Sequence, residues 1–481
     1  MEKIRKSPKL DGRRIYAAAV FLFFVYFMLK QVNEGLWYAF YCVYYLYLCP
    51  VLIAFGLYFS RREKPLEFKL FTLFFLWLYI SRLLNGDYFL AYDGGAVMDM
   101  GLGCAFFAVC LVLNGEDRYR YLDWLSIAVA VFYTLIGIAV LYGVILQREL
   151  TNPLFYGQLL NFEELMYRAR VLGKSSNESV MWFFISFFLL FYLFVRKKKL
   201  LWRIAIVPAA AINYLGIVVT FSRSGRLAFS AGIALLTAMA ILKRPELKTQ
   251  ARKVLAAAAL TCLVLPLVYL SFDGAAAGIR LASNWAVAAV DEAEQAEPAV
   301  QAEPTAAVMN ALLAAEQGSQ EAPDDEQHMY QDNRGLDDSE RFVVYESIIP
   351  TLQREPLRLL RGCKYQGVMS VANTVLKNHK VHFHNFLIQT LAYTGLPGLA
   401  LCLAFCVLMT VKIIKLYFSP APFELKVLSM ILVGSLIYNM LEVSLFYYAD
   451  IRAHIFYLIA GAVLACYQDR FPKAAAEGAG R

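Results

Sequence analysis

The feature that most constrains this chain is a series of apolar runs, each long enough to cross a lipid bilayer as a helix. A spanning helix needs about 20 mainly apolar residues, because its backbone polar groups must be bonded within the segment. The runs lie at about 15–31, 36–59, 67–84, 96–114, 122–146, 178–195, 204–221, 226–242, 254–272, 395–416, 424–446 and 452–468. They predict an all-α integral membrane protein of about 12 transmembrane helices with a large, partly helical extracytoplasmic loop.

Composition supports a protein that lives in the membrane. The chain is 59% hydrophobic and only 17% charged, whereas about a quarter of the residues in soluble proteins are charged. We expect membrane lipids as its surroundings and no nucleic-acid partner, because the net charge of +8 comes from cations at the ends of the runs. Eight of the nine cysteines fall in apolar runs, so neither a disulfide framework nor a metal-type spacing is indicated.

The cations predict the orientation. With the N-terminus in the cytoplasm, the turns that hold Arg118, Arg196 and Lys412 all fall on the cytoplasmic side, as the positive-inside rule requires. Both termini are then cytoplasmic. The division follows: helices one to nine in 1–272, an extracytoplasmic loop in 273–383, a histidine-bearing helix with helices ten to twelve in 384–468, and a cytoplasmic tail in 469–481.

The long outer loop is expected to have two parts. Residues 283–328 are rich in Ala, Glu, Gln and Pro without Lys or Arg, which is typical of a flexible insert. Ser339 opens a stretch with helical apolar spacing that carries Arg341. A further helix is expected from near Asn385 to a break at Gly395–Gly398.

Arginines on the outer side are not needed for orientation. Arg170 lies in the loop 147–177, and Arg223 and Arg226 lie in a tight turn between two spans. One interpretation is that they extend to lipid headgroups. The other is that they bind a phosphate, because each guanidinium offers a planar fork of donors and small residues beside it let a ligand approach.

Three of the five histidines stand together, at His379, His382 and His384. They suggest a metal cluster, a helix cap or a general base. No carboxylate accompanies them, so no metal site is expected. A neutral imidazole can take a proton from a sugar hydroxyl, and His384 is best placed, with Asn385 beside it to orient a ring. Glu442 is an acid near the outer end of a span, and we expect an arginine as its partner.

Four segments in this order resemble the O-antigen ligase and polymerase family, whose members are bacterial multi-span enzymes. The segments are Arg170-Val-Leu-Gly-Lys-Ser-Ser-Asn177, Thr220-Phe-Ser-Arg-Ser-Gly-Arg-Leu-Ala228, the helix of Ser339 to Tyr345 followed by Pro356 and Gly362, and His384-Asn385-Phe-Leu-Ile-Gln389 with Gly395-Leu-Pro-Gly398. The resemblance covers about residues 165–465. Ser224 stands where the family usually has glycine, and the insert is atypical.

The resemblance implies a metal-independent, inverting glycosyltransferase of surface polysaccharide assembly, such as lipopolysaccharide, in the cytoplasmic (inner) membrane with its active site outside. The donor would be a glycan on undecaprenyl pyrophosphate and the acceptor a hydroxyl of a glycan or lipid, with no cofactor. By carry-over, Arg170, Arg223 and Arg341 bind the pyrophosphate and His384 is the base. Arg226, Asn385, Asn177 and Glu442 support them, and Arg168 is a substitute for Arg170.

Other classes of membrane protein explain the sequence less well. A lipid-linked glycan transporter or flippase without transferase activity is the main alternative, but we find no repeat between the two halves. A polyprenyl-phosphate glycosyltransferase of the dolichol-mannose type would carry an acidic motif in the first outer loop, where only Glu34 is found. A structural scaffold does not explain the outer Arg and His residues. Within the family both a ligase and a polymerase fit, with a slight preference for a polymerase or transferase.

Overall fold

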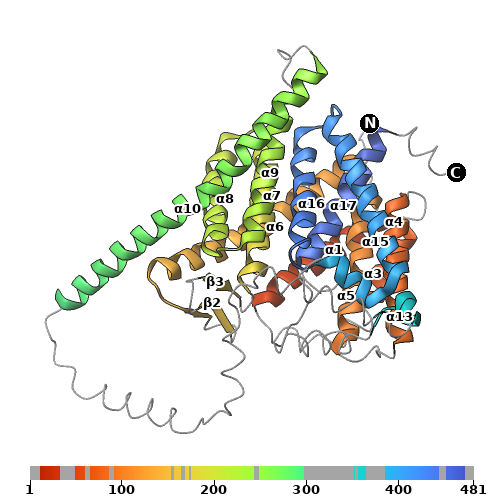
Figure 1. Cartoon of the computed structure of the whole chain (residues 1–481), viewed down its shortest axis with the longest axis horizontal. Coiled ribbons are helices and arrows are strands. Elements are labelled where there is room, and N and C mark those ends of the chain that lie inside the picture. The colour runs from red at the N-terminus through yellow and green to blue at the C-terminus, as the bar shows by residue number, and fades with distance from the viewer. Residues whose placement is uncertain are drawn as a thin grey trace, which may run out of the picture.

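The computed structural model describes residues 11–32, 49–59, 65–85, 92–152, 157–163, 168–172, 175–242, 249–296, 352, 356–363, 385–443 and 451–471. These parts of the chain are mostly helical. The helices are α1 (Gly12–Val32), α3 (Cys49–Phe59), α4 (Leu66–Leu84), α5 (Tyr92–Val112), α6 (Gly115–Ile145), α7 (Ser176–Arg196), α8 (Leu200–Val219), α9 (Arg223–Leu242), α10 (Gln250–Ala296), α13 (Pro356–Arg361), α15 (Phe386–Phe418), α16 (Phe423–Asn439) and α17 (Ile451–Arg470). Figure 1 shows them as a bundle.

The predicted membrane character is confirmed. Within the described ranges, eight helices are long and apolar enough to cross a membrane, namely α1, α6, α7, α8, α9, α10, α15 and α17. Each of the other predicted spans also overlaps a helix: α3, α4, α5 or α16. These four are shorter or carry more charge, so the number of twelve spans stays a prediction.

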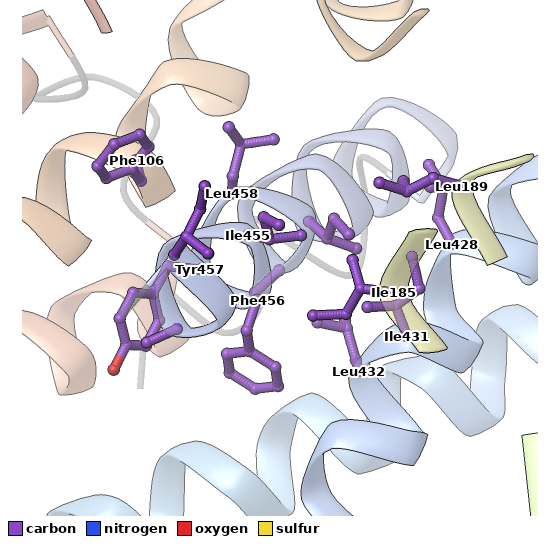
Figure 2. Close-up of a cluster of buried hydrophobic side chains, with 14 of the residues drawn as sticks. Phe106, Ile185, Leu189, Leu428, Ile431, Leu432, Ile455, Phe456, Tyr457 and Leu458 are labelled. Carbon is purple, nitrogen blue, oxygen red and sulfur yellow. The ribbon is translucent and has the colours of Figure 1, made fainter. Parts of the chain in front are cut away.

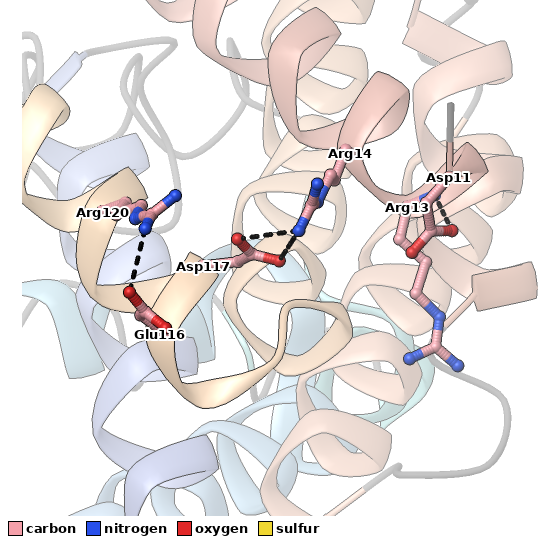
Figure 3. Close-up of polar contacts among 6 residues, drawn as sticks. All are labelled: Asp11, Arg13, Arg14, Glu116, Asp117 and Arg120. Carbon is pink, nitrogen blue, oxygen red and sulfur yellow. Dashed lines mark hydrogen bonds and ion pairs between the residues drawn. The ribbon is translucent and has the colours of Figure 1, made fainter. Parts of the chain in front are cut away.

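One end of the bundle is held by ion pairs between the helix ends that the sequence placed in the cytoplasm. The pairs are Arg14–Asp117 at 3.0 Å, Arg118–Asp469 at 2.7 Å, Arg196–Asp123 at 2.8 Å and Lys412–Glu67 at 2.8 Å. Figure 3 shows Arg14 reaching from α1 to Asp117 of α6. The first turns of α1, α4 and α6 therefore lie with the last turns of α7, α15 and α17. The opposite helix ends carry the candidate site.

Helix α17 is the centre of the core. Every residue from Ile451 to Tyr467 is buried, so α17 is enclosed by the rest of the described chain on all sides. Figure 2 shows its side chains between those of the neighbouring helices, with Phe106 of α5 on one side and Ile185 of α7 and Leu432 of α16 on the other. This central helix anchors the end of the bundle at which Arg452 lies.

Helix α15 confirms the predicted break. Gly395 has φ 66° and ψ −169°, which separates the helix into Phe386–Thr394 and a longer second half with Pro397 in its first turn. The carbonyls released by the break find other donors. Ala392 O accepts from the Cys363 N–H at 2.8 Å, Tyr393 O from the Ser81 hydroxyl at 2.8 Å, and Thr394 O from the Trp77 indole at 2.7 Å. The break is therefore a built feature, joined to α4 and to the short helix α13.

Two features of the fold differ from the sequence prediction. Helix α10 continues past the predicted span end at 272 and into the segment predicted as a flexible insert, up to Ala296. Residues 273–296 are rich in alanine, the strongest helix former, and the helix ends just before Pro298. In Figure 1 its later half slants away from the other helices.

The second difference is a small antiparallel sheet in the outer loop, with β1 (Leu150–Asn152), β2 (Gly157–Glu163) and β3 (Arg168–Val171) in the order β1-β2-β3. The sheet was not predicted, but the described chain is otherwise mostly helical, as expected of an all-α membrane protein. Leu160 pairs with Val171, and these two residues and Ala169 are buried. The alternation of buried and exposed positions along β3 is the pattern of a strand with one covered face, and it leaves Arg170 on the other face.

Candidate functional site

The first part of the candidate site is the N-terminus of α7, where Ser175 and Glu178 form a capping box. The Ser175 hydroxyl accepts from the Glu178 N–H, and the Glu178 carboxylate accepts from the Ser175 N–H, both at 3.3 Å. These bonds satisfy two of the N–H groups that every helix start leaves open. They also fix the position of the two residues between them, including Asn177.

Asn177 joins α7 to the end of α16. Its side-chain amide donates to Glu442 Oε1 at 2.7 Å, and its carbonyl accepts from the Tyr438 hydroxyl. Glu442 is buried. The amide of Asn177 is one partner of this acid, and the arginine that we predicted beside it stays a prediction. The two supporting residues therefore bind each other.

Asn385 joins the start of α15 to the same point. Its side-chain oxygen accepts from the N–H groups of Leu387 and Ile388 at 3.0 and 3.2 Å, so it is the N-cap of the helix. Its amide nitrogen donates to the Met440 carbonyl at 3.0 Å. The sequence analysis expected Asn385 to orient a ring or a sugar. In the structure both ends of its amide are bound to backbone.

Arg452 is a site residue that the sequence analysis missed. It lies in the first turn of α17, is 1% exposed, and contacts Glu178 through its carbonyl at 3.1 Å and its carboxylate at 3.3 Å. The signal was present, because a charged residue inside a span is costly and is usually functional or paired. We had counted it as the end of a span.

The Arg170 strand rests on the second turn of α7. The Val171 N–H donates to the Ser179 hydroxyl at 3.2 Å, which fixes β3 beside the helix. Arg170 itself is partly exposed. Its strand is therefore held one turn away from Asn177.

The turn that carries Arg223 rests on the same part of α7. Phe221 has a positive φ of 51°, and the Ser222 hydroxyl accepts from the Gly225 N–H at 3.3 Å as α9 begins. A Cβ at Gly225 would lie 2.2 Å from a methyl group of Val180. Only glycine lets α9 approach α7 so closely. Arg223 is exposed at this position.

Arg226 lies on the same helix and is buried. Its Nη1 donates to Asp273 Oδ1 of α10 at 2.9 Å, and its guanidinium carbon lies 5.4 Å from the ring centres of both Phe221 and Phe272. Arg226 is therefore paired within the protein. Arg223, by contrast, is the residue of this turn that we predicted to bind phosphate.

The structure thus brings together Asn177, Glu442 and Asn385, and it places the backbone of Arg170 and Arg223 against one part of α7. Arg341 and His384, as well as Arg168's side chain, lie outside the described residues, so their roles stay predictions. Among the residues that the structure describes, no three His, Cys, Asp or Glu side chains are grouped so that they could hold a metal ion.

A comparison with known protein families gives a match to part of the chain. Residues 208–403 match the family model described as O-antigen ligase. No curated protein matches the chain. The matched region begins in α8 and includes Arg223, Arg226, Asn385 and the Gly395 break, as well as Arg341 and His384. The resemblance predicted from the sequence is confirmed there, because residues 208–403 of this membrane protein are similar to the O-antigen ligase family.

Proposed function

We propose that this protein transfers or polymerises a glycan from an undecaprenyl-pyrophosphate donor onto an acceptor hydroxyl, at the outer face of the cytoplasmic membrane. The O-antigen ligase match supports glycan transfer in surface polysaccharide assembly. The observation that carries the rest is the convergence of the Arg170 strand, the Arg223 turn and the Asn385 cap at one end of the bundle. This end lies opposite the ion-paired helix ends.

The donor pyrophosphate would be bound by Arg170, Arg223 and Arg341. A guanidinium matches two oxygens of a phosphate at once, and several guanidiniums share the charge that develops on the leaving group. Such donors stabilise a leaving pyrophosphate without a metal ion. Arg223 is exposed at the start of α9, as a residue that receives a ligand from outside must be.

His384 would act as the general base. Its neutral imidazole takes the proton of the acceptor hydroxyl, whose oxygen attacks the anomeric carbon of the donor sugar. The bond between that carbon and the pyrophosphate oxygen breaks, the lipid pyrophosphate leaves with the electron pair, and the anomeric configuration inverts. Asn385, the residue after the base, supports it by its cap and by its bond to the end of α16.

The test is surface-glycan production by cells that carry single variants. His384→Ala and Arg223→Ala should each abolish transfer while the amount of inserted protein is unchanged. His328→Ala, a histidine outside the motif, and Arg120→Ala, an exposed arginine of the ion-paired end, serve as matched controls and should retain transfer. Full product from His384→Ala would rule out the base assignment.

The product of the reaction distinguishes a ligase from a polymerase. A glycan joined to a lipid or protein acceptor identifies a ligase, and a lengthened lipid-linked chain identifies a polymerase. Movement of lipid-linked glycan across the membrane by the purified protein, with no new glycosidic bond, would replace the proposal by the transporter reading.

A further inference from the structure

The pair of Arg226 and Asp273 is asymmetric. The Arg226 side chain is 9% exposed, whereas the Asp273 side chain is 66% exposed. A guanidinium has five N–H donors, yet the hydrogen bond between Arg226 and Asp273 joins one nitrogen to one carboxylate oxygen. Within the described part of the chain, the buried Arg226 Nε has no hydrogen-bond partner. A buried cation with spare donors therefore faces an anion that water can reach.

Two aromatic rings enclose the Arg226 guanidinium. The ring centres of Phe221 and Phe272 both lie 5.4 Å from its central carbon, and the rings restrict its motion and keep water away from it. Arg226 follows the exposed Arg223 by three residues on α9, so the two side chains share one side of the helix. Arg226 is therefore the next cation along α9 for a ligand that binds Arg223 through one anionic group and carries a second one.

Asp273 belongs to α10, and few residues of this helix are buried. In the described chain, the polar contacts of its outer half with the bundle include Asp273 to Arg226, Ser271 to Tyr214 at 2.8 Å, and Ser283 to Gln147 at 3.1 Å and to the Val144 carbonyl at 3.4 Å. An ion pair with one exposed partner contributes only about 1 kcal/mol or less, because water and salt screen it. The carboxylate can therefore be exchanged for a better ligand at low cost.

We propose that Asp273 is the resting counter-ion of Arg226 and that a phosphoryl group of the lipid-linked donor displaces it. This inference rests on the proposed function. A phosphate offers the guanidinium two oxygens with more charge than one carboxylate oxygen. Displacement also releases the outer half of α10 from the start of α9. Asp273 thus lowers the affinity for the donor by competing for the same cation.

The test is the Kd of undecaprenyl pyrophosphate for the full chain in phosphatidylcholine nanodiscs. Asp273→Asn should bind about three- to fivefold more tightly than the wild type, which is the range expected for a partly exposed ion pair. Asp273→Glu keeps a carboxylate and should stay near the wild type. Glu149→Gln removes an exposed carboxylate at the same end of the bundle, without a contact to Arg226, and should leave the Kd unchanged.

A double-variant cycle separates competition from a general electrostatic effect. In an Arg226→Gln background, Asp273→Asn should no longer tighten binding, because the shared cation is gone. Tightening of the same size in both backgrounds would overturn the proposal, as would unchanged or weaker binding by Asp273→Asn in the native background.

The source of the phosphate is resolved by parallel titrations. Inorganic pyrophosphate tests the headgroup without its lipid, and nanodiscs that contain phosphatidylglycerol test an ordinary anionic lipid. A tightening by Asp273→Asn that appears with phosphatidylglycerol alone overturns the assignment to the donor. If the wild type fails to bind the lipid pyrophosphate, the proposed function fails; if the wild type binds it and only the Asp273 effect is absent, this inference alone fails.

Discussion

Replacing Gly395 by alanine tests whether the break in α15 is built as described. The glycine has φ 66° and ψ −169°, a combination that residues with a side chain rarely adopt. An added Cβ would also lie 2.6 Å from the carbonyl oxygens of Leu359 and Leu360 in α13. These atoms are backbone, so they cannot rotate away as a side chain would. Either the break or the short helix must move.

The cost can be added from its parts. The strained backbone costs about 1–3 kcal/mol, and forcing atoms into a filled space costs about 1–3 kcal/mol more. If α13 moves, the bond between the Cys363 N–H and the Ala392 carbonyl is also lost, at about 1 kcal/mol. Gly395→Ala should therefore destabilise the protein by about 2–7 kcal/mol, a large share of the stability of a typical domain.

The assay is thermal unfolding of the purified protein in nanodiscs, with transfer activity measured in parallel. In a chain of 481 residues, 1 kcal/mol shifts the Tm by about 1 °C, so Gly395→Ala should lower it by about 2–7 °C. It should also reduce transfer, because the first half of α15 carries the Asn385 cap. Gly278→Ala is the matched control. Nothing lies within 4 Å of a Cβ at that helical position, so its Tm should stay equal or rise slightly. An unchanged Tm for Gly395→Ala would refute the packing argument.

Three other predictions follow from the polar contacts of the site. Arg452→Ala removes the buried guanidinium that bonds the partly exposed Glu178 carboxylate and should cost about 1.5–3 kcal/mol in thermal unfolding, with Arg452→Lys between it and the wild type. Glu442→Ala removes the acceptor of the Asn177 amide and should cost about 1–3 kcal/mol, whereas Glu442→Gln keeps an acceptor oxygen and should cost less. Transfer by the purified protein should be unchanged after exhaustive treatment with a chelator; activity that disappears and returns with a divalent ion would contradict the metal-free mechanism.

Hydropathy was sufficient to locate the helices, because in a bilayer the chain must satisfy its backbone within each segment. It was insufficient where composition and structure are less tightly linked. Residues 273–296 carry polar groups that look like a linker, yet their alanines favour a helix once α10 has started. The strands near Arg170 are short and gain their stability from contact with α6 and α7, which no local pattern reveals.

The residues of the site were easier to select than their partners. Asn177, Asn385 and Glu442 were selected individually from their places at span ends, and the structure places them together. The expectation of an arginine beside Glu442 was made from charge alone and stays a prediction, whereas the amide of Asn177 is a partner that charge does not indicate. Arg452 was missed because a span end is also where a lone arginine can extend to the membrane surface. Distinguishing the two needs the position of Glu178, which is far away in the sequence.

The enclosed position of α17 has a consequence for the order of assembly. This helix is made after the other described helices, yet it occupies the middle of the bundle and is in contact with α5, α7 and α16. The earlier helices must therefore wait in the membrane with their central faces uncovered or covered by lipid. Arg452 arrives with this helix, so the N-terminus of α7 gains its partner only after the helices before α17 have been made. A chain that stops before residue 451 would insert those earlier helices and still lack a finished site, which makes activity depend on the synthesis of α17.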